Sequence, residues 1–395
     1  MARKPKVALS PEPEPGSAQQ AASIREVPTL DDLLGQDHAV ALLRAALSSG
    51  RIHHAWVFHG PVGVGKFTAA MAFAAMLLDP TTAPDLSGKL APDPDSQVQH
   101  LIRTNSHPDL HIVTKELAAI SSDPEIRDRK QRVIPVQVVR EFLIEPAQRT
   151  RSVLGKSLAS KVFIVDEAEL LAPAGQDAML KTLEEPPEGT VIILVTPSEE
   201  RLLPTVRSRS QRVAFTPLDD KAMREWYHRA GLPEDPPERR DWVLRFAGGS
   251  PGWAASAIEH DLYAWEQTLA PALASLDRGT PVPELGAALY ALVEEKAAAA
   301  VKTNPDASKE AANIYWARRL LSYLAERYRL AHRDALLRAG GPAPASVSAP
   351  FLRATEALAA AENHAAANVN LNIVMENLAA QLAMRLARPA AARTR

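Results

Sequence analysis

The sequence of 395 residues contains no cysteine. This absence excludes a disulfide framework, a zinc site built on thiolates and a thiol nucleophile. No apolar run approaches the length of a membrane span, and the N-terminus lacks the hydrophobic core of a signal peptide. The formal net charge is only −2, so a general basic surface for nucleic acid is not expected. These absences predict a soluble, cytoplasmic protein with no contact to a membrane.

The composition favours a folded protein of several domains. Hydrophobic residues make up 46% of the chain and charged residues 23%, which is enough to build buried cores. A chain of this length is expected to form two or three domains. We predict the following divisions: a disordered tail at 1–25, an α/β domain at 26–217, a small helical domain at 218–261, a helical bundle at 262–388, and a second tail at 389–395.

A glycine-rich stretch organises the first half of the chain. Residues 60–67 read Gly-Pro-Val-Gly-Val-Gly-Lys-Phe, between an apolar run at 55–58 and a helix-forming run at 69–76. A strand, a glycine loop and a helix in this order place loop amides and a helix N-terminus around an anion. A bare glycine turn is the alternative, which these flanks disfavour. The candidate phosphate-binding residues are Gly60, Gly63, Gly65 and Lys66.

The position after Lys66 departs from the phosphate-loop pattern. A Ser or Thr hydroxyl is expected there as a magnesium ligand, and this chain has Phe67. Thr68 follows, but it is rotated by about 100° around the helix and is a poor substitute. The loop therefore fits a polyphosphate better than it fits a metal-dependent hydrolase.

Polar residues end the two strands that the sequence predicts at 161–165 and 191–195. Asp166 and Glu167 are an acidic pair of the kind that holds a metal through water and polarises an attacking water. Thr196 could sense a γ-phosphate. Each has a plainer interpretation, as helix-capping acids or as a threonine at a strand end. Because strand ends of a parallel sheet lie side by side, we expect these residues to share a crevice with the glycine loop.

Two arginines and several histidines complete the candidates. Arg207 and Arg209 lie in a short segment that is either a solvated turn or the source of an arginine finger for a neighbouring subunit. The histidines are scattered without metal-ligand spacing, so structural roles are expected and no metal site is predicted. They are His53, His54, His59, His107 and His111.

The remaining pattern predicts the architecture. Continuous apolar strands that alternate with helices indicate a parallel sheet covered on both faces. Residues 79–97 are rich in Pro, Asp and Thr and are interpreted as a surface excursion rather than an element. After residue 262 no strand signal remains, and apolar stripes at helical spacing predict a bundle. One stripe lies within 317–331 and the other within 371–386.

The ordered motifs resemble bacterial clamp-loader subunits, the AAA+ group that includes the delta-prime and gamma/tau subunits of DNA polymerase III. The resemblance covers residues 30 to 255. It implies an AAA+ P-loop NTPase-like domain at 26–217, a helical lid at 218–261 and a helical collar for oligomerisation at 262–388. The segments that carry it are Leu33–Gln36, His54–Ala55, Gly60–Lys66, His107–Asp109, Val165–Glu169, Leu180–Pro187 and Leu203–Arg209.

Departures from the family pattern bear on which subunit the chain resembles. An active gamma-type ATPase would have Ser or Thr at Phe67 and Arg at Trp253, and it usually has Asn at Asp177 and Cys at Ser210. The zinc module of the family would fall within 79–97, and without cysteines no zinc is expected. Loss of a magnesium ligand and of a lid cation predicts that this chain does not hydrolyse ATP by itself.

The resemblance thus implies a delta-prime-like subunit of the clamp loader, which helps to load a sliding clamp on primed DNA during replication. Its expected partners are gamma/tau-type and delta-type subunits, the clamp and primer-template DNA. Arg209 would act in trans, and ATP binding through Gly65 and Lys66 is left open. The alternative is an active gamma/tau-type ATPase in which Asp166 binds the metal, Glu167 is the base and Phe67 is tolerated.

Overall fold

The computed structural model describes residues 27–84, 88–127, 133–150, 152, 156–232, 236–303, 308–339, 345–367 and 369–386. The tails predicted at 1–25 and 389–395 lie outside these ranges, as does the helix break predicted at 340–342. The described residues form two compact units. The first spans 27–232 with 249–253, and the second spans 236–248 with 254–386.

The first unit is built on a five-stranded sheet in which all neighbouring strands are parallel, in the order β4-β5-β6-β1-β7. This confirms the predicted fold class. The strands are β1 (Ala55–His59), β4 (Leu110–Val113), β5 (Lys161–Val165), β6 (Thr190–Thr196) and β7 (Gln211–Ala214). β1, β5 and β6 occupy the interior, where continuous apolar strands are expected. Their carboxyl ends meet at one edge of the sheet.

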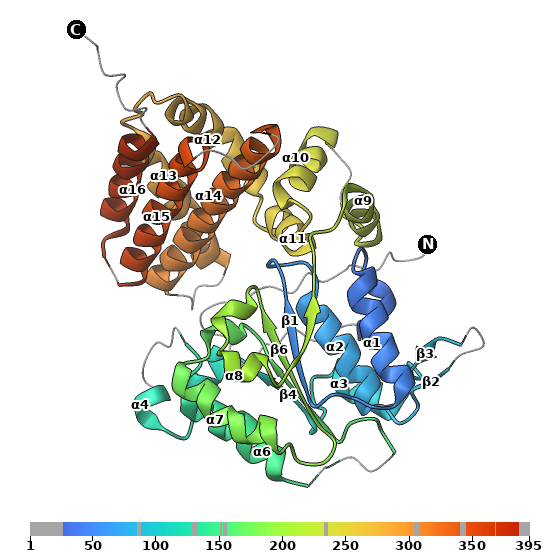
Figure 1. The fold of residues 1–395 in the computed structure, drawn as a ribbon. Coiled ribbons are helices and arrows are strands. Elements are labelled where there is room, and N and C mark those ends of the chain that lie inside the picture. The colour runs from blue at the N-terminus through green and yellow to red at the C-terminus, as the bar shows by residue number, and fades with distance from the viewer. Residues whose placement is uncertain are drawn as a thin grey trace. The chain divides into compact units, whose positions relative to one another are not determined.

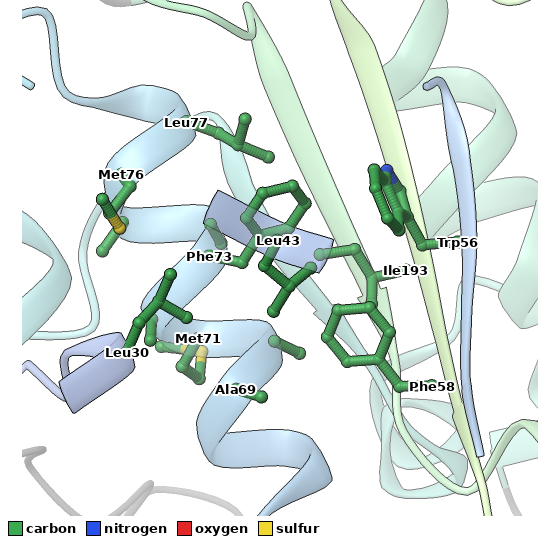
Figure 2. Packing of buried hydrophobic residues seen from close by; sticks show 14 of the residues in the cluster. Leu30, Leu43, Trp56, Phe58, Ala69, Met71, Phe73, Met76, Leu77 and Ile193 are labelled. Carbon is green, nitrogen blue, oxygen red and sulfur yellow. The ribbon is translucent and has the colours of Figure 1, made fainter. Parts of the chain in front are cut away.

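One face of this sheet is covered by α1 (Asp37–Ser49), α2 (Lys66–Leu78) and α3 (Gln97–Arg103) (Figure 1). Trp56 and Phe58 of β1 lie in the layer between the sheet and these helices (Figure 2). Trp56 meets Phe73 of α2 edge to face, with ring centroids 5.2 Å apart. α2 is buried around almost its whole circumference, which explains its run of small and apolar residues. This packing fixes the helix that follows the glycine loop.

The opposite face carries α5 (Val136–Val139), a π-helical turn at Arg140–Ile144, α6 (Glu145–Gln148), α7 (Pro173–Glu184) and α8 (Pro204–Arg207). Met179 of α7 and Phe163 of β5 are fully buried in this layer. A sheet covered on both faces is therefore confirmed. The short elements are η1 (Leu30–Asp32), η2 (Lys115–Ile120), α4 (Pro124–Arg127), η4 (Ala168–Leu170), η5 (Glu199–Arg201) and α9 (Asp220–Arg229).

The segment 79–97 contains structure that its composition did not reveal. β2 (Ala83–Pro84) and β3 (Leu90–Ala91) pair as a short antiparallel hairpin, so the prediction of an excursion without elements is wrong. Asp79 at its start is only 1% exposed and accepts hydrogen bonds from Thr81, Ser96 and Gln99. One buried carboxylate thus joins the end of α2 to the beginning of α3.

The second unit consists of helices throughout its described residues. They are α10 (Pro237–Ala247), most of α11 (Pro251–Glu259), α12 (Leu262–Asp277), α13 (Leu285–Thr303), α14 (Lys309–Ala339), α15 (Ala345–Ala366) and α16 (Leu371–Leu386). α14 packs on α13 and α15, and α16 packs on the same two helices. Both predicted stripes point inward: Leu320 and Leu324 of α14, and Met375 and Leu382 of α16, are buried. None of the described helices is long and apolar enough to cross a membrane.

Candidate functional site

The glycine loop lies between the carboxyl end of β1 and the beginning of α2, as the sequence predicted. Gly60, Gly63 and Gly65 have φ angles of 138°, 76° and 97°, a backbone region that other residues rarely adopt. At Gly60 a Cβ atom would lie 2.1 Å from the carbonyl oxygen of Phe215. The glycines are therefore required by the shape of the loop and by its close packing.

Lys66 fixes this shape from inside the loop. Its side chain is buried, and Nζ donates hydrogen bonds to the carbonyl oxygens of Gly60 (2.7 Å) and Pro61 (2.6 Å). Burial lowers the pKa of Lys66 to about 8, against the opposing effect of the Glu169 and Asp166 carboxylates. The loop is thus already folded around its lysine, with a cation at its centre.

A second segment of the first unit packs on the outside of the loop. The Gly252 N–H donates to the Gly63 carbonyl (2.8 Å), and the Ser250 hydroxyl donates to the Val62 carbonyl (3.0 Å). The approach is so close that a Cβ at Gly63 would lie 2.4 Å from the Ser250 oxygen. These bonds use carbonyl groups of the loop and not its amides. Trp253, where the family pattern expects arginine, lies in the first turn of the helix Pro251–Glu259, and its N–H donates to the Ser250 hydroxyl oxygen.

The side chains after Lys66 do not form a magnesium site. Phe67 is half-buried and packs against the hydrophobic layer that contains Phe73. Thr68 is exposed on the side of α2 that faces away from this layer. No group of three or more histidine, aspartate or glutamate side chains gathers into a metal-binding cluster in the described parts of the chain. The side chain directly after the loop lysine therefore offers no oxygen ligand to a metal.

Asp166 follows β5 and lies near Lys66. The pKa of Asp166 is raised to about 6, chiefly by burial and also by the neighbouring Glu167 and Glu169 carboxylates, while Lys66 and a hydrogen bond from the Glu167 N–H oppose the change. Asp166 is thus an acidic neighbour of Lys66, as the sequence predicted. Its elevated pKa reflects the loss of water around the carboxylate.

Glu167 has a different environment from Asp166. Its backbone adopts a left-handed conformation, with φ of 49°, and its side chain is 46% exposed. The carboxylate forms an ion pair with Lys115 Nζ at 2.5 Å. Lys115 belongs to η2, which follows β4. The residue predicted as a base therefore pairs with a cation at the surface.

Glu169 is a site residue that the sequence reasoning missed. It lies on η4, and its carboxylate, like that of Asp166, favours the charged form of Lys66 and so opposes the lowering of the lysine pKa. Burial raises the pKa of Glu169 itself. Its Oε2 atom is buried without a hydrogen-bond partner among the described residues. Residues three apart in a 3₁₀ turn lie on the same side of the turn. The three-residue spacing between Asp166 and Glu169 could therefore have indicated from the sequence that Glu169 belongs with Asp166.

Thr196 ends β6 beside β1, where it pairs in register with His59. It is fully buried, and its hydroxyl oxygen lies 3.0 Å from the Ser198 carbonyl. The sheet therefore brings Lys66, Asp166 and Thr196 to one edge, as the topology required. Glu169 completes the set.

Arg209 lies outside this group, just beyond α8. One guanidinium nitrogen donates to the Thr205 carbonyl (3.0 Å), and another pairs with Glu184 Oε1 (2.6 Å). The Arg209 side chain is 36% exposed, and its carboxylate partner is 49% exposed. Arg207, the other arginine of the segment, has its Nε buried without a hydrogen-bond partner in the described part of the chain. The Arg209 guanidinium is thus partly exposed and held by an exposed carboxylate.

Residues 35–219 match the family model described as DNA polymerase III, delta subunit. The matched region contains the sheet, the glycine loop, Asp166 and Arg209. This region is therefore similar to a subunit of DNA polymerase III. The domain begins just before α1 and ends just after β7, so it coincides with the part of the first unit that forms the sheet and its helices.

Proteins similar to this chain are of two kinds. The delta' subunit of DNA polymerase III from Pseudomonas aeruginosa is 32% identical over 50% of this chain and 53% of its own length. The gamma/tau subunit from Mycobacterium tuberculosis is 30% identical over 58% of this chain and 36% of its own length. The match thus spans about half of the first relative and about a third of the second. A solved gamma subunit-related protein from Thermotoga maritima has a TM-score of 0.37 and 15% identity, over 87% of this chain and 99% of that one.

Proposed function

We propose that this chain is a delta-prime-like subunit of a DNA polymerase III clamp loader, which helps to load a sliding clamp on primed DNA. One observation carries the proposal: the side chain after the loop lysine is Phe67, and it packs into a hydrophobic layer. A magnesium ion that bridges two phosphates is a main source of charge stabilisation in phosphoryl transfer. A chain without that ligand is suited to a supporting position in a complex whose other subunits hydrolyse ATP.

Arg209 would supply that support. Its guanidinium is held at the surface by Glu184, so it is oriented in advance and can exchange one anionic partner for another. In the proposed complex it reaches the ATP of an adjacent gamma/tau-type subunit. Asp166 and Glu167 then have no catalytic duty in this chain, which agrees with the pairing of Glu167 with Lys115.

The test is ATP hydrolysis by the complex reconstituted from this chain and the gamma/tau-type and delta-type subunits of the same organism. Arg209→Ala should reduce the DNA-stimulated rate. An arginine finger supplied in trans is worth about 10³ or more at its own site, so turnover at that one site should fall to background. Gel filtration should show an intact complex.

Arg212→Ala is the matched control, because Arg212 is also an exposed arginine with one acidic partner, Glu199. It should leave hydrolysis unchanged. If Arg209→Ala and Arg212→Ala both hydrolyse ATP at the normal rate within an assembled complex, the role of Arg209 in trans is wrong.

An active gamma/tau-type ATPase is the second candidate, favoured by the gamma/tau relative and by the nearness of Lys66 to Asp166. It predicts steady ATP hydrolysis by the purified chain with magnesium and primed DNA. That activity should disappear in Lys66→Ala, provided that circular dichroism shows the variant to be folded. Absence of turnover in the wild-type chain favours the delta-prime-like role.

A further inference from the structure

The glycine loop uses its carbonyl groups and its amides differently. Four consecutive carbonyls accept hydrogen bonds: those of Gly60 and Pro61 from Lys66 Nζ, that of Val62 from the Ser250 hydroxyl, and that of Gly63 from the Gly252 N–H. The N–H groups of Gly63 and Val64 donate no hydrogen bond within the part of the chain that the structure describes. A planar trans peptide unit directs its C=O and its N–H to opposite sides. These two N–H groups therefore point away from the residues that hold the carbonyls.

Two peptide units of the loop thus connect residues 249–253 with the phosphate site that the sequence predicts. The Val62 carbonyl and the Gly63 N–H belong to one unit, and the Gly63 carbonyl and the Val64 N–H belong to the next. A peptide group whose carbonyl accepts a hydrogen bond becomes a better donor through its N–H, because hydrogen bonds in a chain polarise one another. In phosphate-binding loops such N–H groups cradle the phosphates. A bond on either side of these units therefore strengthens the bond on the other side.

Ser250 makes this connection with a single hydroxyl group. The residue is buried, and its hydroxyl donates to the Val62 carbonyl at 3.0 Å and accepts from the Trp253 N–H at 3.2 Å. It therefore joins the loop to the first turn of α11. The contact beside it is equally close, since a Cβ atom at Gly252 would lie 2.7 Å from the Gly63 Cα. Residues 249–253 cannot leave the loop without breaking both carbonyl bonds.

We propose that Ser250 is a positioning residue of the glycine loop, and that binding of a nucleotide phosphate to the loop and docking of residues 249–253 on it strengthen each other through the two shared peptide units. Coupling between two binding events is reciprocal, so each raises the affinity of the other by the same factor. The connection uses main-chain groups and does not need an arginine in place of Trp253. The inference rests on the phosphate-binding role predicted for the loop and is independent of the role of Arg209.

Hydrogen exchange of the full-length chain measures this docking directly, because the Gly252 and Trp253 N–H groups are themselves donors in the bonds concerned. The probe is ADP in the presence of EDTA. ADP should slow exchange at these two amides by about fivefold, the low end of coupling between sites, since the bonds join neutral groups. The slowing should reach a plateau, because the undocked loop still binds ADP more weakly. Protection that came from unfolding of the whole unit would keep growing with ADP concentration.

Inorganic diphosphate separates the phosphates from the rest of the nucleotide. At concentrations that displace ADP from the chain, it should slow exchange at Gly252 and Trp253 to the same plateau. The proposal is overturned if neither ligand binds, if exchange at these amides is unchanged, if protection grows without a plateau, or if only ADP produces the slowing.

Ser250→Ala removes the hydroxyl that bridges Val62 and Trp253. It should weaken the binding of ADP, measured by calorimetry, by about threefold to fivefold, and the slowing at Gly252 should fall below about twofold. Ser49→Ala is the control, because the Ser49 hydroxyl also donates to a backbone carbonyl of the same unit, that of Ala46 at 2.8 Å. It should keep the wild-type affinity and the wild-type slowing.

A purely structural role for Ser250 predicts a different result. Ser250→Ala would then speed exchange at Gly252 equally with and without ADP and leave the affinity for ADP unchanged, which overturns the proposal. Equal losses of affinity in Ser250→Ala and Ser49→Ala also overturn it. If Ser250→Ala does not fold, the plateau in the wild-type chain decides. None of these results bears on the Arg209 test, because that test measures ATP hydrolysis by the assembled complex.

Discussion

The raised pKa of Asp166 predicts that the first unit becomes more stable when this carboxylate is removed. Burial moves the pKa from 3.8 to about 6. The folded unit therefore holds the Asp166 proton more tightly than the unfolded chain, and its stability falls as pH rises from 4 to 6. At pH 7 the ionised Asp166 lowers the stability of the first unit by about 3 kcal/mol, and at pH 5 by about half of that.

Asp166→Asn keeps the side-chain shape without the titrating group. The opening free energy of the first unit should be about 2 to 3 kcal/mol higher in the variant than in the wild type at pH 7, and the two should be equal near pH 4. The attraction to Lys66 is already contained in the pKa of about 6, so it needs no separate correction. Measurements stay below pH 8, where Lys66 itself begins to titrate.

Hydrogen exchange of the β1, β5 and β6 amides is the assay, because it reports the opening free energy of this unit separately from the helical unit. Wild type and variant are compared at each pH, so that intrinsic exchange rates cancel. Asp177→Asn is the control, since Asp177 is exposed on α7. Equal protection of Asp166→Asn and wild type at pH 7 would refute the reasoning, and lower protection would mean that the Lys66 attraction dominates.

Two further substitutions test the loop and the segment that follows α2. Asp79→Ala leaves the Thr81, Ser96 and Gln99 donors unpaired. It should lower the opening free energy of the first unit by about 3 kcal/mol in the same exchange assay. A decrease of less than about 0.5 kcal/mol would contradict the predicted role of this carboxylate. Gly63→Ala adds a Cβ at positive φ, against the Ser250 oxygen. It should raise exchange at residues 250–253, whereas Gly50→Ala, where a Cβ meets nothing within 4 Å, should not.

The pH behaviour of Asp79 should be opposite to that of Asp166. Burial alone would raise the pKa of Asp79, but hydrogen bonds from Ser96, Thr81 and Gln99 lower it below its ordinary value. The stability contributed by Asp79 is therefore complete above pH 4 and is lost as pH falls through its lowered pKa. Because the chain lacks the cysteines of a zinc module, this network is what joins the ends of the 79–97 segment.

The sequence determined the main architecture through its periodicities. Apolar runs such as 161–165 fit interior strands of a covered parallel sheet, and the stripe through Leu320 and Leu324 fits one side of a helix. The edge strand β7 was missed because Gln211–Ala214 contains one buried side chain, Val213, and has no run to reveal it. Short edge strands are defined by their pairing partners rather than by composition.

The glycine loop was also determined by the sequence, down to the missing hydroxyl at Phe67. The spacing of Gly60, Gly65 and Lys66 encodes a local shape that needs few distant contacts. What only the tertiary structure decided is the partner of the Glu167 carboxylate. Glu167 has a left-handed backbone conformation at the end of β5 and pairs with Lys115, which follows β4, because β4 and β5 lie side by side in the sheet and no local pattern specifies that pairing.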